Sequence, residues 1–138
     1  MAYSGKTQGF TMVEAVISIA LIVLVLGGSY ALVSQSTRGI YAARNHYVAI
    51  NISRARIERV RNFPYDQLPT LTETNIVVDD SGVPISSGYF RRTTLVDTNY
   101  QAGLTKIEVR TDIRDAKTLT FKGDNESVAS LFTEYLTE

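Results

Sequence analysis

The sequence predicts an α+β fold in which one long N-terminal helix packs on a small antiparallel β-sheet head. An uninterrupted apolar run covers residues 10–33, and a more polar segment with helical spacing of apolar residues follows it to residue 62. After Pro64 the chain contains prolines, glycines and short β-branched runs, a pattern typical of loops and strands. The segment LTKIEVRTDIR alternates apolar and charged residues, as a half-buried strand does.

The 10–33 segment has the length and composition of a membrane span. Its only ionisable side chain besides tyrosine is Glu14, and as a helix it would cover about 36 Å. The apolar core of a secretory signal peptide is shorter, at about 7 to 15 residues. A helix buried on all sides would need more surrounding chain than this sequence supplies. We therefore expect a transmembrane helix.

A carboxylate inside this span needs an explanation. An ionised, unpaired Glu14 would cost a few kcal/mol, although near the end of the span it could also reach the membrane surface. The surrounding stretch GFTMVEAVISIALIVLVLGG, which begins at Gly9, resembles the N-terminal signature of type IV pilins and type II secretion pseudopilins. That signature is commonly a glycine followed by F-T-L-x-E and an apolar helix. Met12 in place of leucine is the one departure, and it conserves volume.

The resemblance implies how the N-terminus is processed. A prepilin peptidase would cut between Gly9 and Phe10 on the cytoplasmic side and methylate the new N-terminus at Phe10. In the family, the glutamate that corresponds to Glu14 pairs with the N-terminal ammonium of a neighbouring subunit. Such a pair in a low-dielectric bundle is costly to break, and it would therefore enforce the register of filament assembly.

The same resemblance divides the chain into four parts. We expect a prepilin leader peptide at 1–9, a transmembrane and filament-core helix at 10–33, an amphipathic helix entering the head at 34–62, and the antiparallel head at 63–138.

The flanking charges and the expected cleavage site predict opposite orientations in the membrane. Lys6 flanks one end of the span, whereas Arg38 and Arg44 flank the other, and a positive-inside count favours a cytoplasmic head. The peptidase, however, requires Gly9 to face the cytoplasm. We therefore expect a single-pass inner-membrane protein with its head outside, which then enters a periplasmic pseudopilus or a surface pilus.

The second half of the helix carries an apolar stripe that should pack on the head. It should end near Phe63, because Pro64 disfavours helical geometry in the residue before it. Ile50, Ile57 and Val60 are expected to complete the core of the head. The stripe consists of Ile40, Ala43, Tyr47, Ile50 and Ile57, widened by Val48, Ile52 and Ala55.

Gly27 and Gly28 interrupt the apolar span, and each costs about 1 kcal/mol relative to alanine inside a helix. They could allow close packing against another membrane helix. They could also form a soft point that unwinds when the subunit leaves the membrane for a filament, as is thought for the family. The two interpretations are compatible.

In the head, one face of the strand within 104–114 should be buried and the other exposed. Residues 118–122, TLTFK, are expected to form a further strand that enters a hairpin at Gly123, Asp124 and Asn125. The tail at 126–137 fits a helix better by spacing, but the resemblance favours a strand, which we adopt. The face of the strand within 104–114 that is expected to be buried comprises Ile107, Val109, Thr111 and Ile113.

Enzyme chemistry finds little support in the sequence. His46 is the only histidine, and no G-x-S-x-G or H-E-x-x-H motif accompanies it, so a surface or packing role is expected. The adjacent carboxylates Asp79 and Asp80 in DDSG are better explained by an Asx turn than by calcium, because regularly spaced oxygen ligands are missing. With no cysteine, cysteine metal sites and disulfides are excluded. We expect no cofactor and no metal.

Four arginines, Arg54, Arg56, Arg59 and Arg61, cluster in RARIERVR. Arginines attract nucleic-acid phosphates, and competence pseudopili offer a precedent for DNA binding. The 14 basic and 14 acidic residues of the chain balance, however, and Glu58 lies within the cluster. A solvated helix face or ion pairs between subunits is the better interpretation, and nucleic acid is not an expected partner.

The sequence therefore predicts a structural subunit, a minor pilin or pseudopilin of a type IV pilus or type II secretion pseudopilus, and not an enzyme. The alternative is a binding module of a pilus or competence filament that presents its head to DNA, a surface or a secreted substrate. The implied partners are the prepilin peptidase, other pilin or pseudopilin subunits, the inner-membrane assembly platform, and membrane lipid before assembly.

Overall fold

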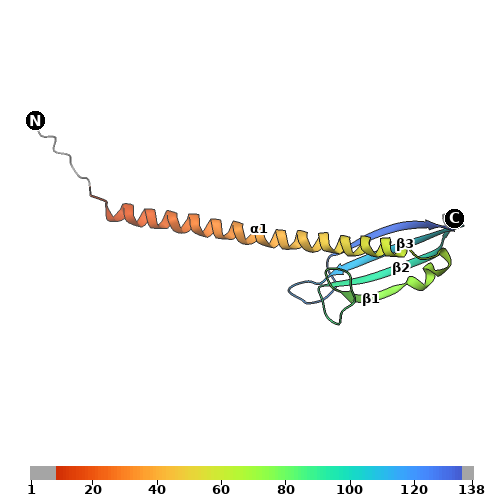
Figure 1. The fold of residues 1–138 in the computed structure, drawn as a ribbon. Coiled ribbons are helices and arrows are strands. Elements are labelled where there is room, and N and C mark those ends of the chain that lie inside the picture. The colour runs from red at the N-terminus through yellow and green to blue at the C-terminus, as the bar shows by residue number, and fades with distance from the viewer. Residues whose placement is uncertain (1–8, 135–138) are drawn as a thin grey trace, which may run out of the picture. The chain divides into compact units, whose positions relative to one another are not determined.

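The computed structural model of the chain describes residues 9–134 and has the predicted α+β, pilin-like architecture (Figure 1). One long helix is followed by a short 3-10 helix and a four-stranded sheet. In chain order the elements are α1 (Met12–Val60), η1 (Tyr65–Leu71), β1 (Glu73–Val78), β2 (Phe90–Gln101), β3 (Leu104–Ile113) and β4 (Asn125–Thr133).

Helix α1 begins where a threonine caps it. The backbone N–H of Glu14 donates to Thr11 Oγ1 at 3.2 Å, and the N–H of Ala15 donates to the Thr11 carbonyl at 3.1 Å. The side-chain bond satisfies an N–H that has no partner within the helix, and the carbonyl bond is the first bond of the helix, which together are the role of an N-cap residue. The helix therefore starts at Met12.

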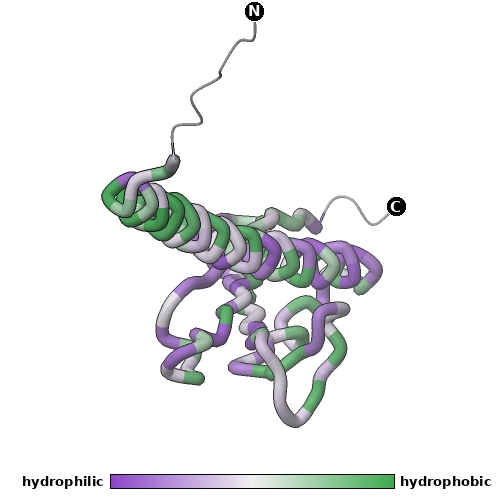
Figure 2. The backbone as a smooth tube through the Cα atoms, turned by 90° about the vertical axis from the view of Figure 1, so that its left-hand side faces the viewer, coloured by the Kyte–Doolittle hydropathy of each residue, from purple (hydrophilic) through white to green (hydrophobic). Residues whose placement is uncertain are grey.

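The chain forms two compact units, residues 1–41 and 42–138, and α1 contributes to both. In the first unit, α1 contains an 18-residue window with a mean hydropathy of 2.5 and no buried residue. Figure 2 colours much of this part green, as apolar. Among the described residues, α1 is the one helix that is long and apolar enough to cross a membrane by length and composition.

In the second unit, α1 ends as the proline rule predicts. The last helical residue is Val60, and the N–H groups of Asn62 and Phe63 close tight turns onto the carbonyls of Arg59 and Val60 at 3.2 and 3.1 Å. The chain leaves these turns through Pro64, which precedes η1, so the predicted stop near Phe63 is confirmed.

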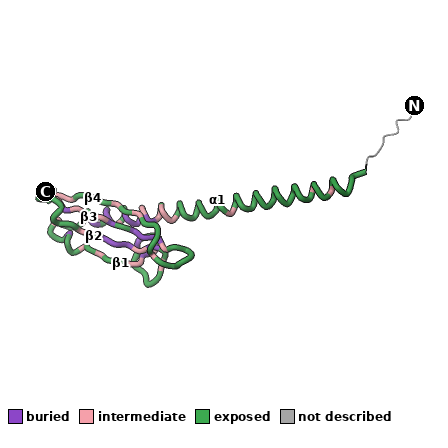
Figure 3. Tube along the Cα trace, turned by 180° about the vertical axis from the view of Figure 1, so that it is seen from behind, coloured by how far each residue is buried: buried purple, intermediate pink, exposed green. Residues whose placement is uncertain are grey.

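The sheet is an antiparallel meander whose strand order, β1-β2-β3-β4, follows the chain. Phe90 pairs with Ile113 at one end of the sheet, and Gln101 pairs with Leu104 at the other. Strand β4 pairs with β3 without a register shift. Figure 3 shows the buried positions along β2 and β3 in purple. The predicted buried face of β3 is confirmed, because Ile107, Val109, Thr111 and Ile113 are all buried.

The end of α1 packs on this sheet through two apolar clusters. One contains Ala49 and Ile52 of α1, and the other contains Ile57 and Val60. The prediction that Ile57 and Val60 join the core is therefore confirmed. Their partners in the sheet and η1 are Val78, Phe90 and Ile113 in the first cluster and Leu68, Ile107 and Val109 in the second.

The predicted stripe was only partly correct. Ile52 and Ile57 are buried, as expected, and Ile50 is partly buried. Ile40 and Tyr47 are each 67% exposed, however, and Ala49, which the stripe omitted, is buried against the sheet. The helix is apolar over more than half of its circumference here, so periodicity alone could not select the face that meets the sheet. An apolar strip remains outside the core of the head.

The strand predicted at 118–122 is wrong, since these residues form a loop. Asp115 Oδ1 accepts the backbone N–H groups of Lys117 and Thr118 at 2.8 and 2.7 Å, and Leu119 has a φ of 55°. These local bonds give the backbone an alternative to a sheet ladder, and a positive φ at leucine breaks an extended run.

The predicted tail strand is confirmed up to Thr133, whereas residue 134 is described but lies beyond the strand. Strand β4 covers Asn125–Thr133, and Val128 and Phe132 on it pack against the second cluster. The final predicted residues, 135–137, lie outside the described residues.

Candidate functional site

The expected cleavage junction lies immediately before α1. Gly9 and Phe10 are outside the helix, and no atom lies within 4 Å of a Cβ built on Gly9. The side chain of Phe10 is 73% exposed. The junction is thus non-helical and uncovered, which suits a substrate peptide. The rest of the expected leader, including Lys6, lies outside the described residues.

Glu14 occupies the first turn of α1. Its backbone N–H is held by Thr11, and its side chain is exposed. A carboxylate is favoured at this position because the N-terminal end of a helix carries a partial positive charge. Among residues 9–134, no side chain forms an ion pair or hydrogen bond with the Glu14 carboxylate, which leaves it available to a group from another molecule.

The paired glycines of the span have open surroundings. No atom lies within 4 Å of a Cβ built on Gly27 or Gly28. Beside them, Ser29 Oγ donates to the Val25 carbonyl at 2.8 Å, so its hydroxyl is satisfied within the helix. Contacts within this chain therefore do not require either glycine.

Almost all apolar side chains of α1 between residues 12 and 33 are exposed, and none is buried. Val13, Ile17, Leu21 and Leu24 are between 54% and 71% exposed. Residues 9–134 leave this part of the helix uncovered, and a helix with apolar residues on every side is suited to lipid or to other apolar helices around it.

The arginine cluster does not act as one surface. Arg56 turns into the head, where its Nη2 lies 3.1 Å from Glu73 Oε1 and 3.2 Å from the Leu71 carbonyl. Arg61 pairs with Glu58 on the exposed side of the helix at 3.4 Å. The expectation of a single solvated face is therefore wrong for Arg56.

Arg54 and Arg59 complete the cluster. Both side chains are exposed, and neither has an ion pair or hydrogen bond within residues 9–134. The charge that remains accessible to a partner is therefore smaller than the four arginines suggest.

Glu73 is the centre of a largely buried polar network that the sequence did not reveal. Its carboxylate accepts Arg92 Nε at 3.0 Å, Arg92 Nη2 at 3.3 Å and Thr94 Oγ1 at 3.2 Å, in addition to Arg56. Arg92 also donates to the Gly82 carbonyl at 2.9 Å and is 3% exposed. One carboxylate thus serves two guanidinium groups.

Because two guanidinium groups share one carboxylate, not every donor of Arg56 has a partner. Its buried Nε has no hydrogen-bond partner among the described residues. Burial lowers the pKa of the Arg56 guanidinium, Glu73 opposes that shift, and the like charges of Arg92 and Arg59 add to it. Glu73 is therefore the group that makes burial of Arg56 and Arg92 tolerable.

His46 links α1 to the first residues of β4. Its Nδ1 lies 2.8 Å from Glu126 Oε1, and its Nε2 lies 3.7 Å from Asp124 Oδ2. The histidine is partly buried in this contact. It has a packing role in the head, as expected.

The acidic turn is organised by its own backbone. Asp79 Oδ1 accepts the N–H groups of Ser81 and Val83, each at 2.9 Å, which is the predicted Asx turn. Within the part of the chain that the structure describes, no group of three or more metal-ligating side chains occurs.

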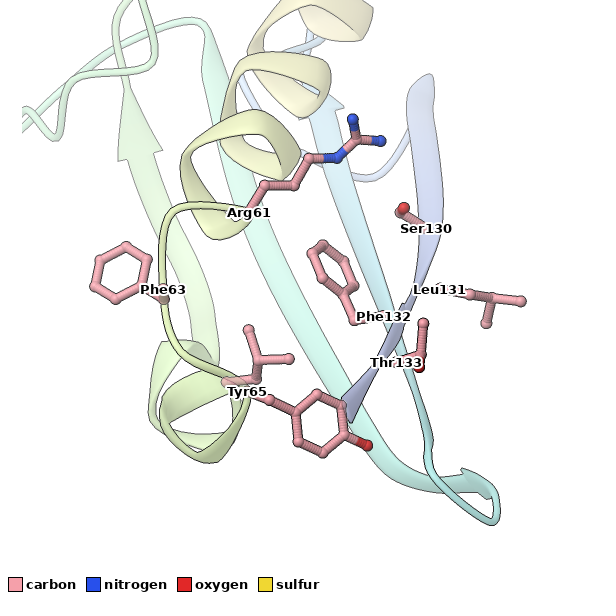
Figure 4. A pocket seen from close by; sticks show the side chains of 8 residues that line it. Arg61, Phe63, Tyr65, Ser130, Leu131, Phe132 and Thr133 are labelled. Carbon is pink, nitrogen blue, oxygen red and sulfur yellow. The ribbon is translucent and has the colours of Figure 1, made fainter. Parts of the chain in front are cut away.

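A groove of about 370 Å³ lies between the residues that follow α1 and strand β4 (Figure 4). In the figure, Phe132 points into this space, and the side chain of Arg61 extends beside it from the helix. The residues that define the groove here are Arg61, Phe63, Tyr65, Ser130, Leu131 and Phe132. Sequence reasoning missed it because its two sides come from distant segments.

Comparison with known proteins supports the N-terminal features. The family model described as "Prokaryotic N-terminal methylation motif" matches residues 5–30. The matched region contains Gly9, Phe10, Glu14 and both glycines of the span. A search of the curated proteins and of the solved structures finds no match to this chain.

The matched motif supports a membrane-anchored, pilin-like precursor that is processed by prepilin peptidase and assembles with other pilin subunits. It points to a structural subunit rather than to an enzyme. Together with the long helix on a four-stranded antiparallel sheet, residues 5–30 identify this chain as carrying the N-terminal signature of the type IV pilins and pseudopilins.

Proposed function

We propose that the chain is a minor pilin or minor pseudopilin of a type IV pilus or a type II secretion pseudopilus. The observation that carries this proposal is the start of α1. An exposed Gly9–Phe10 junction precedes the helix, and Glu14 lies in its first turn with no side-chain partner among residues 9–134. The apolar surface that follows is not covered by the described part of the chain.

In this proposal the peptidase removes residues 1–9 and exposes the amine of Phe10, which is then methylated. The Glu14 carboxylate of one subunit pairs with the amine of its neighbour. Residues 10–33 lie in lipid before assembly and against other subunits afterwards. The uncovered apolar surface supports both environments, since each replaces water around it.

The proposed orientation places Gly9 in the cytoplasm and the head outside the inner membrane. The head is then delivered to a periplasmic pseudopilus or a surface pilus by the assembly platform. Gly27 and Gly28 would assist this transfer, either by close helix packing or by local unwinding.

Two variants separate processing from assembly. Gly9→Val should block cleavage, so mass spectrometry of the membrane protein should find the leader still attached. Glu14→Gln should leave cleavage intact and weaken incorporation. Removing one partner of a buried ion pair typically costs about 3 to 5 kcal/mol, which corresponds to roughly two to three orders of magnitude in a contact.

Incorporation is measured as co-purification with other pilin subunits at matched expression. Glu58→Gln is the control, because it removes one carboxylate from the exposed face of the same helix. A mature chain that starts at a residue other than methylated Phe10 would refute the processing step. Equal incorporation of Glu14→Gln and the control would refute the proposed pairing.

A further inference from the structure

The stretch of α1 that follows the apolar run carries positive charge without a counter-charge. No aspartate or glutamate occurs between Glu14 and Glu58, whereas Arg38 and Arg44 lie within that interval. Both arginines precede the part of the helix that is buried in the head. Their side chains are exposed, and neither forms an ion pair or hydrogen bond with residues 9–134. The charge of both arginines is therefore available to a group from outside the chain.

Exposed tyrosines flank the boundary between the apolar run and the polar part of the helix. Tyr30 and Tyr41 are 78% and 61% exposed. The apolar run ends at Val33, and residues 34–37 are all polar. Tyrosine combines an apolar ring with a polar hydroxyl, so it is enriched where a membrane meets water. This pattern indicates that the membrane surface lies in the interval from Tyr30 to Tyr41.

The separation of Glu14 and Arg38 matches the thickness of a bilayer. Arg38 follows Glu14 by 24 residues of continuous helix, which corresponds to a rise of about 36 Å. The hydrocarbon core of a bilayer is about 30 Å thick, and the headgroup layers bring the total to about 40 to 45 Å. When Glu14 lies at one surface of the membrane, the long side chain of Arg38 therefore reaches the headgroup layer of the other.

The anion present in that layer is the phosphate of a phospholipid. A guanidinium group offers N–H donors in a planar fork that matches a phosphate, and it stays charged at physiological pH. Every phospholipid has a phosphate, but only an anionic lipid leaves a net negative charge for Arg38 and Arg44 to neutralise. Near an anionic surface each arginine strengthens binding by roughly fivefold. An anionic phospholipid therefore suits these residues better than a zwitterionic one.

The orientation proposed above gives this counter-charge a purpose. With Gly9 in the cytoplasm, Arg38 and Arg44 lie outside the inner membrane, although basic residues beside a span favour the cytoplasmic side. Anionic lipid in the outer leaflet offsets that preference, because it attracts the same residues to the outer surface. In this respect the inference rests on the proposed function.

We propose that Arg38 and Arg44 each bind the phosphate of an anionic phospholipid at the outer surface of the membrane before the subunit is assembled. The ring of Tyr41, three residues after Arg38, lies in the same headgroup layer. These contacts fix the depth of the apolar run in the bilayer, and they are lost when the subunit leaves the membrane. Anionic lipid thus favours the membrane-bound subunit over the assembled one.

Native mass spectrometry of the full chain in an uncharged detergent tests lipid binding. The chain is titrated separately with phosphatidylglycerol, which is anionic, and with phosphatidylcholine, which is zwitterionic. The wild-type chain should bind phosphatidylglycerol with the higher affinity. Replacing both arginines, Arg38→Gln with Arg44→Gln, should weaken the binding of phosphatidylglycerol by roughly fivefold for each arginine and change the binding of phosphatidylcholine far less.

The matched control is Arg54→Gln with Arg59→Gln. These arginines are also exposed and unpaired among residues 9–134, and their removal changes the net charge equally, but they lie in the part of α1 that packs on the sheet. The control should bind phosphatidylglycerol as the wild-type chain does. Higher ionic strength should reduce the preference of the wild-type chain for the anionic lipid, because salt screens exposed charges. Near-ultraviolet circular dichroism of the tyrosines verifies that both double variants keep a folded head.

Weaker binding of phosphatidylglycerol in the Arg38 and Arg44 variant alone supports the inference. Equal affinity of the wild-type chain for the two lipids, or an equal loss in the control, would overturn it. A variant that keeps its lipid preference but no longer co-purifies with pilin subunits would also overturn it, because these arginines would then pair with acidic groups of other subunits. Co-purification of the wild-type chain tests the proposed function separately. A chain that co-purifies but does not distinguish the lipids leaves the proposed function standing and removes the lipid contact.

Discussion

Replacing Glu73 with glutamine should strongly destabilise the head. The substitution preserves the shape of the side chain but removes its charge and places an amide NH₂ among the donors of Arg56, Arg92 and Thr94. Glutamine keeps one carbonyl oxygen, whereas the carboxylate now accepts bonds on both oxygens. Two like-charged guanidinium groups would then remain in a largely buried site.

The size of the effect follows from burial. Breaking a buried ion pair costs about 3 to 5 kcal/mol, and because the Glu73 side chain is 23% exposed, we expect the lower end, about 3 kcal/mol. In a head of this size each kcal/mol lowers the melting temperature by roughly 4 to 8 °C. The expected decrease is therefore roughly 12 to 24 °C.

The assay is thermal unfolding of the full chain in detergent, followed by near-ultraviolet circular dichroism of its tyrosines, because the far-ultraviolet signal would be dominated by α1. Glu58→Gln is the control, since it breaks a pair with Arg61 in which both side chains are more than half exposed. It should change the free energy of unfolding by less than about 1 kcal/mol. A Glu73→Gln melting temperature within a few degrees of this control would show that the network does not stabilise the head.

Three further predictions concern other parts of the chain. His46→Ala should lower the free energy of unfolding of the head by about 0.5 to 1.5 kcal/mol, because it removes one partly exposed bond to Glu126; equal melting temperatures for this variant and wild type would contradict it. Gly27→Ala with Gly28→Ala should leave leader cleavage unchanged, since no atom obstructs the new methyl groups, but should reduce co-purification with pilin subunits; unchanged co-purification would argue against both roles of the glycines. The N–H groups of Thr118 and Lys117 lower the pKa of Asp115 in the folded chain. The stabilisation by Asp115 should therefore be fully present above the pKa that it has in the unfolded chain, and it should be lost as the pH falls through its lower folded pKa. An NMR titration that gave the Asp115 carboxyl the usual pKa of an aspartate would refute this.

The elements that the sequence predicted correctly are long segments in which the apolar residues follow a single pattern throughout. The apolar run and the stop at Pro64 define α1, and the alternation from Ile107 to Ile113 defines β3. In both cases the hydrophobic pattern and the backbone preference agree, so no distant contact is needed to decide the structure.

The predictions failed where the structure is decided by contacts between distant residues or by bonds between close neighbours in the chain. The rotation of α1 on the sheet depends on which side chains fit against Phe90 and Ile107, and an apolar surface wider than the contact leaves that choice open. The 118–122 loop fails for the opposite reason. A single carboxylate, Asp115, bonds its own neighbours and outweighs the strand-like composition that follows it.

The candidate site divides in the same way. Gly9, Phe10 and Glu14 could be proposed from the sequence because they belong to a short contiguous motif, which the family model also matches. The Glu73 network and the groove were missed because each is assembled from separated segments, such as Arg61 with Phe132. The sequence could not show that Arg56 turns into the head, because the four arginines of the cluster are chemically identical.

The order of the strands has a consequence for the speed of folding. Because β1, β2, β3 and β4 are neighbours in both the chain and the sheet, each ladder closes a loop much shorter than the separation between α1 and the sheet, and the loop between β2 and β3 is the shortest. The contacts of α1 are different, because Ser53 bonds Thr111 across 58 positions of sequence. We therefore expect the hairpins to form first and the docking of α1 to be the slow step. Until that step is complete, the apolar face of the meander is open to solvent, and the head is most vulnerable to proteases during this interval.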